Sequence, residues 1–186
     1  ATVEQLQKAL QTKLVTSEQL VSMYQARMAA YEDTGPHINA YIHVNANADL
    51  EAQQVDNLRH PGAQNGPLYG IPILLKDNID TADMPTTAGS VALAGSIPPD
   101  DAFIVQKLRK AGAIILGKGT LTEYANFIAI GMPTGYSSLG GFGFNPYDPR
   151  TDPRPGFNDG RPVLQTGGSS SGPGIGVNAN LTAIAI

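Results

Sequence analysis

Residues 167 to 172 read Gly-Gly-Ser-Ser-Ser-Gly, six consecutive positions without one bulky side chain. Such a run contributes nothing to a hydrophobic core, and glycine inside a regular element costs about 1 kcal/mol relative to alanine. It does let backbone N–H groups and hydroxyls approach a small polar ligand closely. One interpretation is a flexible Gly/Ser linker. The residues that follow, 175–186, are largely apolar and carry no charge. An exposed linker seldom leads directly into a buried element, so we predict an ordered loop at a functional site.

The composition excludes several classes of protein. The chain has 186 residues, enough for one domain with a sizeable core, and a net charge of −4 without a basic run. We therefore expect no nucleic acid partner. The longest apolar stretches are far too short to span a membrane, so no membrane partner is expected either. The absence of cysteine excludes disulfides, thiolate metal sites and a cysteine nucleophile.

The first third of the chain reads as mainly helical. Thr2 and Thr16 each begin a stretch with capping-box spacing, and Leu20, Tyr24 and Met28 then recur at four-residue steps on one helix face. Residues 37–44 alternate like a half-buried strand. A further helix is predicted over 47–59, ended by His60-Pro61-Gly62.

The second part of the chain has the pattern of an α/β fold. Residues 71–75 and 113–117 read as buried strands, separated by an amphipathic helix over 101–111 with Ile104, Val105 and Leu108 facing inward. The first of these strands delivers Lys76 at its end. Residues 142–166 hold five prolines and little periodicity, which is typical of a lid or binding loop.

The candidate chemistry is that of a hydroxyl nucleophile with a lysine base. The three histidines lack metal-ligand spacing, and the Gly/Ser run matches neither a phosphate loop nor the dinucleotide pattern. A serine-rich loop and a lysine on a buried strand are consistent with a Ser/Lys site. Moving a lysine pKa from about 10.4 to about 7 costs roughly 4 to 5 kcal/mol, which burial beside the strand could supply. Asp77 is expected on the opposite face of that strand, and so need not keep Lys76 charged.

Several motifs, in a fixed order from residue 66 to the end, resemble those of the amidase signature family. They are Gly66-Pro67-Leu68-Tyr69-Gly70-Ile71-Pro72, Leu75-Lys76-Asp77-Asn78, Thr87-Ala88-Gly89-Ser90, Ala111-Gly112-Ala113 through Gly117-Lys118, and Gly167 to Gly172. Glu123-Tyr124-Ala125-Asn126-Phe127 is most similar to the peptide-amidase branch. The resemblance implies a mixed β-sheet covered by helices. It also implies hydrolysis of amides through a Ser–cis-Ser–Lys triad, without metal or cofactor.

Roles follow from the resemblance motif by motif. Lys76 is expected to be the general base, and Ser169 the bridging serine that relays the proton, with a cis peptide bond before it. Gly168 is expected to lie against the substrate, while Ser170 and Ser171 support the loop. Lys118 is expected to matter far less than Lys76. In one departure, Gly119-Thr120 replaces the Thr-Asn that is usual after the Gly-Lys pair.

A larger departure concerns the nucleophile. The family's nucleophilic serine lies roughly two dozen residues after the bridging serine, which places it beyond Ile186, and the glycine-rich oxyanion loop before it is missing too. Residues 1–186 are therefore expected to be the N-terminal part of a single amidase domain, incomplete in this chain and inactive alone. Residues 1–65 form a mainly helical lead-in and residues 66–186 start the signature core.

The resemblance implies two kinds of partner, a small-molecule or peptide amide substrate and the remainder of the enzyme polypeptide. Two alternatives remain open. One is a glutaminase subunit of a tRNA-dependent amidotransferase, and the other is a non-catalytic fragment.

Overall fold

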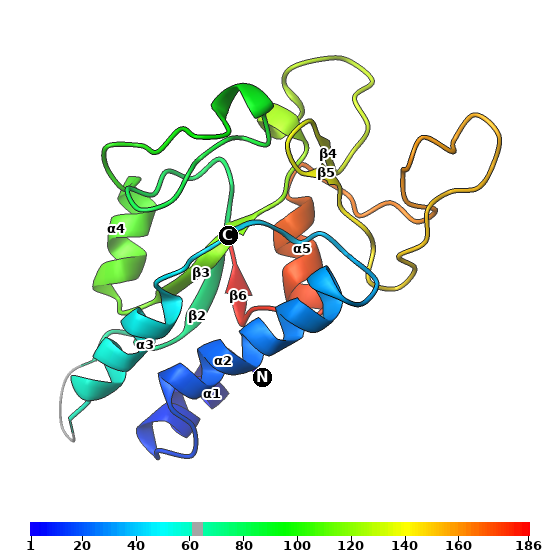
Figure 1. Cartoon of the computed structure of the whole chain (residues 1–186). Coiled ribbons are helices and arrows are strands. Elements are labelled where there is room, and N and C mark those ends of the chain that lie inside the picture. Colours follow the sequence, from blue (N-terminus) through cyan, green and yellow to red (C-terminus); the bar gives the residue numbers. More distant parts are fainter. Residues whose placement is uncertain (61–64) are drawn as a thin grey trace.

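The computed structural model describes residues 1–60 and 65–186, which fold around one mixed sheet (Figure 1). The sheet has four strands in the order β1-β3-β2-β6; β2 runs parallel to β3 and to β6, whereas β1 is antiparallel to β3. Its strands are β1 (Tyr41–Val44), β2 (Pro72–Lys76), β3 (Ile114–Gly119) and β6 (Ile184–Ala185). The mixed α/β sheet with covering helices is the predicted fold class.

Helices cover both faces of the sheet. The helical elements are α1 (Val3–Gln11), α2 (Ser17–Met28), the π-helix η1 (Ala29–Asp33), α3 (Ala48–Asn57), the 3-10 turn η2 (Val91–Leu93), α4 (Phe103–Lys110), the irregular turn η3 (Glu123–Asn126) and α5 (Ser171–Asn178), and residues of α1 to α5 pack against the sheet. Figure 1 shows α4 and α5 on opposite sides of the strands. A small hairpin, β4 (Tyr136–Ser137) with β5 (Gly141–Phe142), lies outside the main sheet.

The two faces of β2 explain its uninterrupted apolar sequence. Leu74 belongs to a buried cluster with residues of α2, α3 and α5, whereas Ile73 and Leu75 belong to a second cluster with residues of α1 and α4. Because successive strand residues point to opposite faces, a strand covered on both sides needs apolar residues at every step. Lys76 ends this strand on the face of Leu74.

The expected helix starts are confirmed. Thr2 and Thr16 are N-caps with complete capping boxes, and Leu20, Tyr24 and Met28 are all buried on α2. The predicted helix over 47–59 is present as α3, and Pro61 and Gly62, expected to end it, lie outside the described residues.

Two expectations need correction. The strand predicted over 37–44 begins only at Tyr41, because His37 and Asn39 have φ values of 51° and 55°, in the left-handed region. Instead, the Asn39 amide donates hydrogen bonds to the carbonyls of Gly140 and Phe142. Ile104 was expected to face inward but is 42% exposed; Val105 and Leu108, three residues apart, form the buried stripe of α4.

Residues 145–163 have no helix or named strand, and they form a projecting segment that we call the arm (Figure 1). Backbone hydrogen bonds from Asp152 N to Arg161 O (2.8 Å) and from Val163 N to Arg150 O (2.9 Å) hold its two sides together. Three arginines each bind the aspartate two residues before them, with shortest distances of 2.6 to 2.7 Å. The arm lies within residues 142–166, predicted to be a lid or binding loop, and its two sides are joined by backbone hydrogen bonds rather than by a helix or named strand.

Candidate active site

Lys76 and Ser169, both predicted to be catalytic, lie together at the carboxyl end of β2. The Lys76 Nζ atom is 2.6 Å from the Ser169 Oγ atom, within hydrogen-bond range. Burial lowers the pKa of Lys76 from its ordinary value of 10.5. Burial penalises the charged form, so it shifts this lysine toward the neutral form that can accept a proton.

The loop that carries Ser169 follows the arm in the chain and leads into α5. The peptide bond between Gly168 and Ser169 is cis. The Ser169 carbonyl accepts a hydrogen bond from the Thr122 N–H at 3.0 Å, and the Gly172 N–H donates to the Thr120 carbonyl at 2.8 Å. The loop is therefore fixed from two directions, by the Lys76 side chain and by the backbone of residues 120–122.

Close packing explains two glycines of the run. A Cβ atom at Gly172 would lie 2.3 Å from the Thr120 nitrogen and 2.4 Å from the Ala40 oxygen, both backbone atoms that cannot yield. A Cβ atom at Gly168 would lie 2.7 Å from the Thr122 hydroxyl and 2.8 Å from the Thr134 methyl. The sequence therefore lacks side chains here because neighbouring segments contact the loop directly.

The serines that follow Ser169 have different surroundings. Ser170 is exposed and forms the N-cap of α5, where its carbonyl accepts a hydrogen bond from the Gly174 N–H at 3.2 Å. Ser171 is buried, and its hydroxyl lies 3.4 Å from the Thr120 carbonyl. Neither contact involves the Lys76 side chain.

Thr122 is a site residue that the sequence analysis missed. It is fully buried, and its hydroxyl accepts a hydrogen bond from the Gly135 N–H at 2.8 Å while its own N–H binds Ser169. It thus joins the serine loop to residues 134–135. The sequence signal that could identify Thr122 is the pair Thr120 and Thr122, two hydroxyl residues two positions apart just beyond a buried strand.

Asp77 lies on the opposite face of β2 from Lys76, and there it pairs with Lys118. The distance from the Lys118 Nζ to the Asp77 Oδ1 is 3.4 Å, and both side chains are fully buried. The Thr87 N–H and hydroxyl donate to Asp77 Oδ2, and Lys118 Nζ donates to the Thr86 hydroxyl at 2.8 Å. Burial lowers the pKa of Lys118, although Asp77 opposes the shift.

This pairing changes the expectation for Lys118. Removing one member of a buried ion pair leaves an uncompensated charge, which is strongly destabilising. A Lys118 variant is therefore unsuitable as the control for a Lys76 variant. Lys110, exposed on α4, is the better control.

Two features are absent from the described ranges. No group of three or more His, Cys, Asp or Glu residues in residues 1–60 and 65–186 is arranged to hold a metal ion. Separately, none of the described helices combines the length and apolar character required to cross a bilayer.

Comparisons with known proteins identify the family and the fold of this chain. The amidase family matches residues 19–186. The native peptide amidase of Stenotrophomonas maltophilia superposes with a TM-score of 0.87 at 42% identity, over 100% of this chain and 35% of that one. An amidase family protein of Bacillus anthracis gives a TM-score of 0.87 at 37% identity, over 100% and 34%.

Sequence relatives fall into two groups. An amidase of Schizosaccharomyces pombe is 38% identical over 100% of this chain and 29% of its own length. One subunit of the glutamyl-tRNA(Gln) amidotransferase of Rhodopirellula baltica is 38% identical over 82% of this chain and 29% of its own length. The chain thus spans about a third of the length of the relatives it matches. With the family matched over nearly the whole chain and the fold shared with solved amidases, the chain belongs to the amidase family.

Proposed function

We propose that this chain is the N-terminal part of an amide hydrolase, in which Lys76 is the general base and Ser169 relays protons to it. The observation that carries the proposal is the 2.6 Å contact between Lys76 Nζ and Ser169 Oγ, and the lowering of the Lys76 pKa by burial supports it. A neutral amine within hydrogen-bond range of a hydroxyl is the arrangement that general-base chemistry needs.

The proposed reaction uses a second serine, on polypeptide that follows Ile186. Its hydroxyl proton passes to Ser169 Oγ as the Ser169 proton passes to Lys76 Nζ, and its oxygen attacks the amide carbonyl. Lys76 then returns a proton through Ser169 to the departing amine, leaving an acyl-enzyme. Water repeats the transfer, releasing the acid and restoring both serines. Gly168, which has no side chain, lies beside the substrate.

The test is a fluorophosphonate, which reacts with activated serines, applied to a polypeptide that continues beyond Ile186. Mass analysis of the labelled peptide should place the label after residue 186, and Lys76→Ala should abolish labelling. Labelling at Ser169, Ser170 or Ser171 together with amide turnover would contradict the proposed roles.

A second candidate is the glutaminase subunit of a tRNA-dependent amidotransferase, favoured by the 38% identity to a glutamyl-tRNA(Gln) amidotransferase chain. That function requires partner subunits and transfer of ammonia. Purification from the native source distinguishes the two, because a glutaminase subunit co-purifies with partners and uses glutamine. As a third possibility, the chain alone acts as a non-catalytic fragment.

A further inference from the structure

A second cavity, of about 390 Å³, lies between the π-helix η1, residues 37–39 and the segment that contains β5. Its wall includes Glu32, His37, Asn39, Gly140, Phe142 and Phe144. The described wall contains none of the residues that the proposed hydrolysis uses. The cavity is therefore a feature separate from the candidate active site.

The wall carries a carboxylate without a cationic partner. Glu32 is half-buried, and its Oε1 atom accepts a hydrogen bond from the Ala40 N–H at 2.7 Å. A carboxylate can accept about four hydrogen bonds, so it has capacity for further donors. Burial raises the pKa of Glu32 by more than the nearby backbone N–H groups lower it. Within residues 1–60 and 65–186, no lysine or arginine forms an ion pair with Glu32. A cation in the cavity would compensate this carboxylate.

The two other polar side chains of the wall are left with acceptors. His37 Nδ1 lies 2.7 Å from the Glu32 carbonyl oxygen, which can only accept, so Nδ1 carries the proton and Nε2 of the neutral ring is an acceptor. The Asn39 amide group donates to the carbonyls of Gly140 at 2.5 Å and Phe142 at 2.8 Å, which uses both of its hydrogens and leaves Oδ1 as an acceptor. None of the described wall residues is a lysine or arginine. The lining therefore suits a donor with positive charge and offers no side-chain donor to an anion.

Two phenylalanines form the apolar part of the wall, and both are held in place. Phe144 packs against the buried cluster that includes Ile38, and the centre of the Phe142 ring lies 4.7 Å from that of Tyr136. Aromatic rings attract cations through their faces and also pack against alkyl groups. A primary ammonium on a short alkyl chain combines three N–H donors, a positive charge and an apolar body, and so matches the whole lining.

We propose that this cavity binds an organic primary ammonium ion. The ammonium donates hydrogen bonds to Glu32, His37 and Asn39, and the alkyl chain packs against Phe142 and Phe144. The site goes beyond the proposed amide hydrolysis and does not depend on it, because binding here needs neither Lys76 nor Ser169.

The experiment titrates n-butylammonium chloride, at about pH 8 and constant ionic strength, into a polypeptide that continues beyond Ile186. Calorimetry gives the Kd, and 1-butanol is the uncharged comparison of nearly the same shape. We expect n-butylammonium to bind with a Kd of about 1 mM, which is within reach of so small a ligand. We expect 1-butanol to bind about tenfold more weakly or worse, because it lacks the charge-assisted hydrogen bonds.

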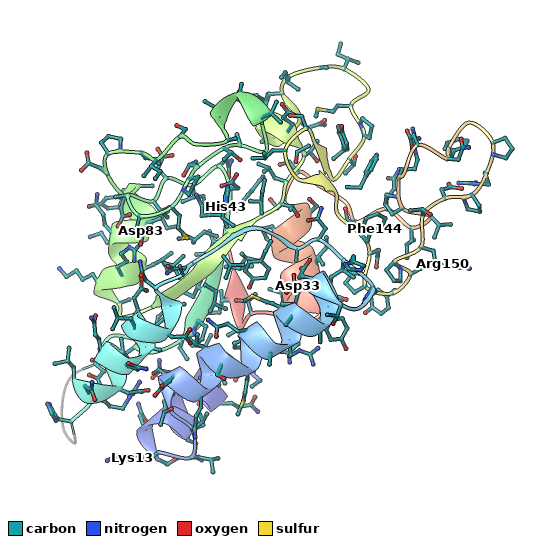
Figure 2. The ribbon with its side chains drawn as sticks, viewed as in Figure 1. Lys13, Asp33, His43, Asp83, Phe144 and Arg150 are labelled. Carbon is teal, nitrogen blue, oxygen red and sulfur yellow. The ribbon has the colours of Figure 1, made fainter. Side chains whose placement is uncertain are left out.

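Two matched variants identify the carboxylate that is responsible. Glu32→Gln keeps the acceptor for the Ala40 N–H but removes the charge, and it should weaken n-butylammonium about tenfold while leaving 1-butanol unchanged. Asp33→Asn removes the same charge from the next residue of η1, which is exposed and outside the cavity wall (Figure 2). It should leave both Kd values unchanged.

Three outcomes overturn the site. Equal affinity of the wild type for n-butylammonium and 1-butanol would show that the cavity does not select a cation. Equal weakening in Glu32→Gln and Asp33→Asn would show attraction to the general negative charge of the surface. A wild type that binds no n-butylammonium also defeats the proposal, including the case in which later polypeptide closes the cavity. Each of these results leaves the proposed hydrolysis standing.

Discussion

Two lysines at the carboxyl ends of neighbouring parallel strands have opposite surroundings. Lys76 pairs with Gly119 in the register of β2 and β3, whereas Lys118 pairs with Leu75, so the two side chains point to opposite faces of the sheet. Lys118 contacts the Asp77 carboxylate, whereas Lys76 contacts only a hydroxyl among its hydrogen-bond partners in the described residues. A lysine that acts as a base needs burial without a neighbouring carboxylate. Lys76 and Lys118 differ in this respect because they lie on opposite faces of the sheet.

Replacing Lys76 with alanine should remove amide hydrolysis from a polypeptide that contains the nucleophile, while the fold remains. Losing one member of a catalytic triad costs orders of magnitude in rate, and we expect a loss of about 1,000-fold or more in kcat. Steady-state kinetics and circular dichroism would measure the two effects. Lys110→Ala is the exposed control and should retain wild-type kinetics. A folded Lys76→Ala variant that keeps more than a few per cent of the rate would refute the assignment.

The pH dependence should follow the lowered pKa of Lys76. Only the neutral amine accepts a proton, so kcat/KM should rise with pH through the Lys76 pKa and level off above it. Since burial lowers that pKa, the rise should be centred below 10.5. A pH–rate profile measures this directly. A rise centred at or above 10.5 would mean that burial does not tune this lysine.

Replacing Lys118 with methionine should destabilise the fold rather than alter the chemistry. It leaves Asp77 buried and charged without its partner, which costs about 3–5 kcal/mol. The double variant Asp77→Asn with Lys118→Met should recover part of that loss, since no charge remains buried. Urea unfolding of both variants measures the difference. Equal stability of Lys118→Met and wild type would show that the pair contributes nothing to folding.

At the scale of elements, residues 120–122 connect β3 to the serine loop. Thr120 accepts from Gly172, and Thr122 donates to Ser169 while its hydroxyl binds Gly135. These contacts join segments separated by tens of residues in the chain. They position Ser169 relative to Lys76, and they bring residues 134–135 over Gly168.

Thr122→Val should therefore lower kcat/KM although it preserves shape. The variant leaves the buried Gly135 N–H without its hydrogen-bond partner, which costs about 1–3 kcal/mol. If about 1.4 kcal/mol of this cost falls on the transition state, kcat/KM drops roughly tenfold. Thr122→Ser retains the hydroxyl and should stay within about twofold of wild type. Kinetics of the two variants side by side test the role of the hydroxyl. Equal kinetics in Val and Ser variants would rule it out.

Sequence patterns could predict the elements here better than the contacts between them. The capping boxes at Thr2 and Thr16 and the apolar run before Lys76 are local signals, and each corresponds to an observed helix or strand. Local patterns carry no information about φ, so they predict a strand that includes His37 and Asn39, whose backbone is left-handed. Thr122 makes hydrogen bonds with Ser169 and Gly135, which are not its neighbours in the chain, and periodicity carries no information about such contacts.

At the scale of the whole molecule, the chain contributes one side of the proposed active site. It holds Lys76 and Ser169, and it spans about a third of the length of its relatives. Large apolar side chains shortly after Thr122 are exposed; Phe127 is 91% exposed and Ile128 is 55% exposed. Neighbouring exposed apolar groups of this size commonly mark a surface that packs against other polypeptide.

We expect residues 1–186 alone to show no amide hydrolysis dependent on Lys76. A base and a relay without a nucleophile have nothing that forms an acyl-enzyme, so the isolated chain should hydrolyse amides no faster than its own Lys76→Ala variant. The exposed apolar side chains should also make it aggregate more readily than a longer polypeptide, which light scattering would measure. The decisive comparison assays both polypeptides, with masses verified, on the same amide. Hydrolysis by the 186-residue chain that disappears on Lys76→Ala would show that the nucleophile lies within it, and the serines of residues 169–171 would then be the first to test.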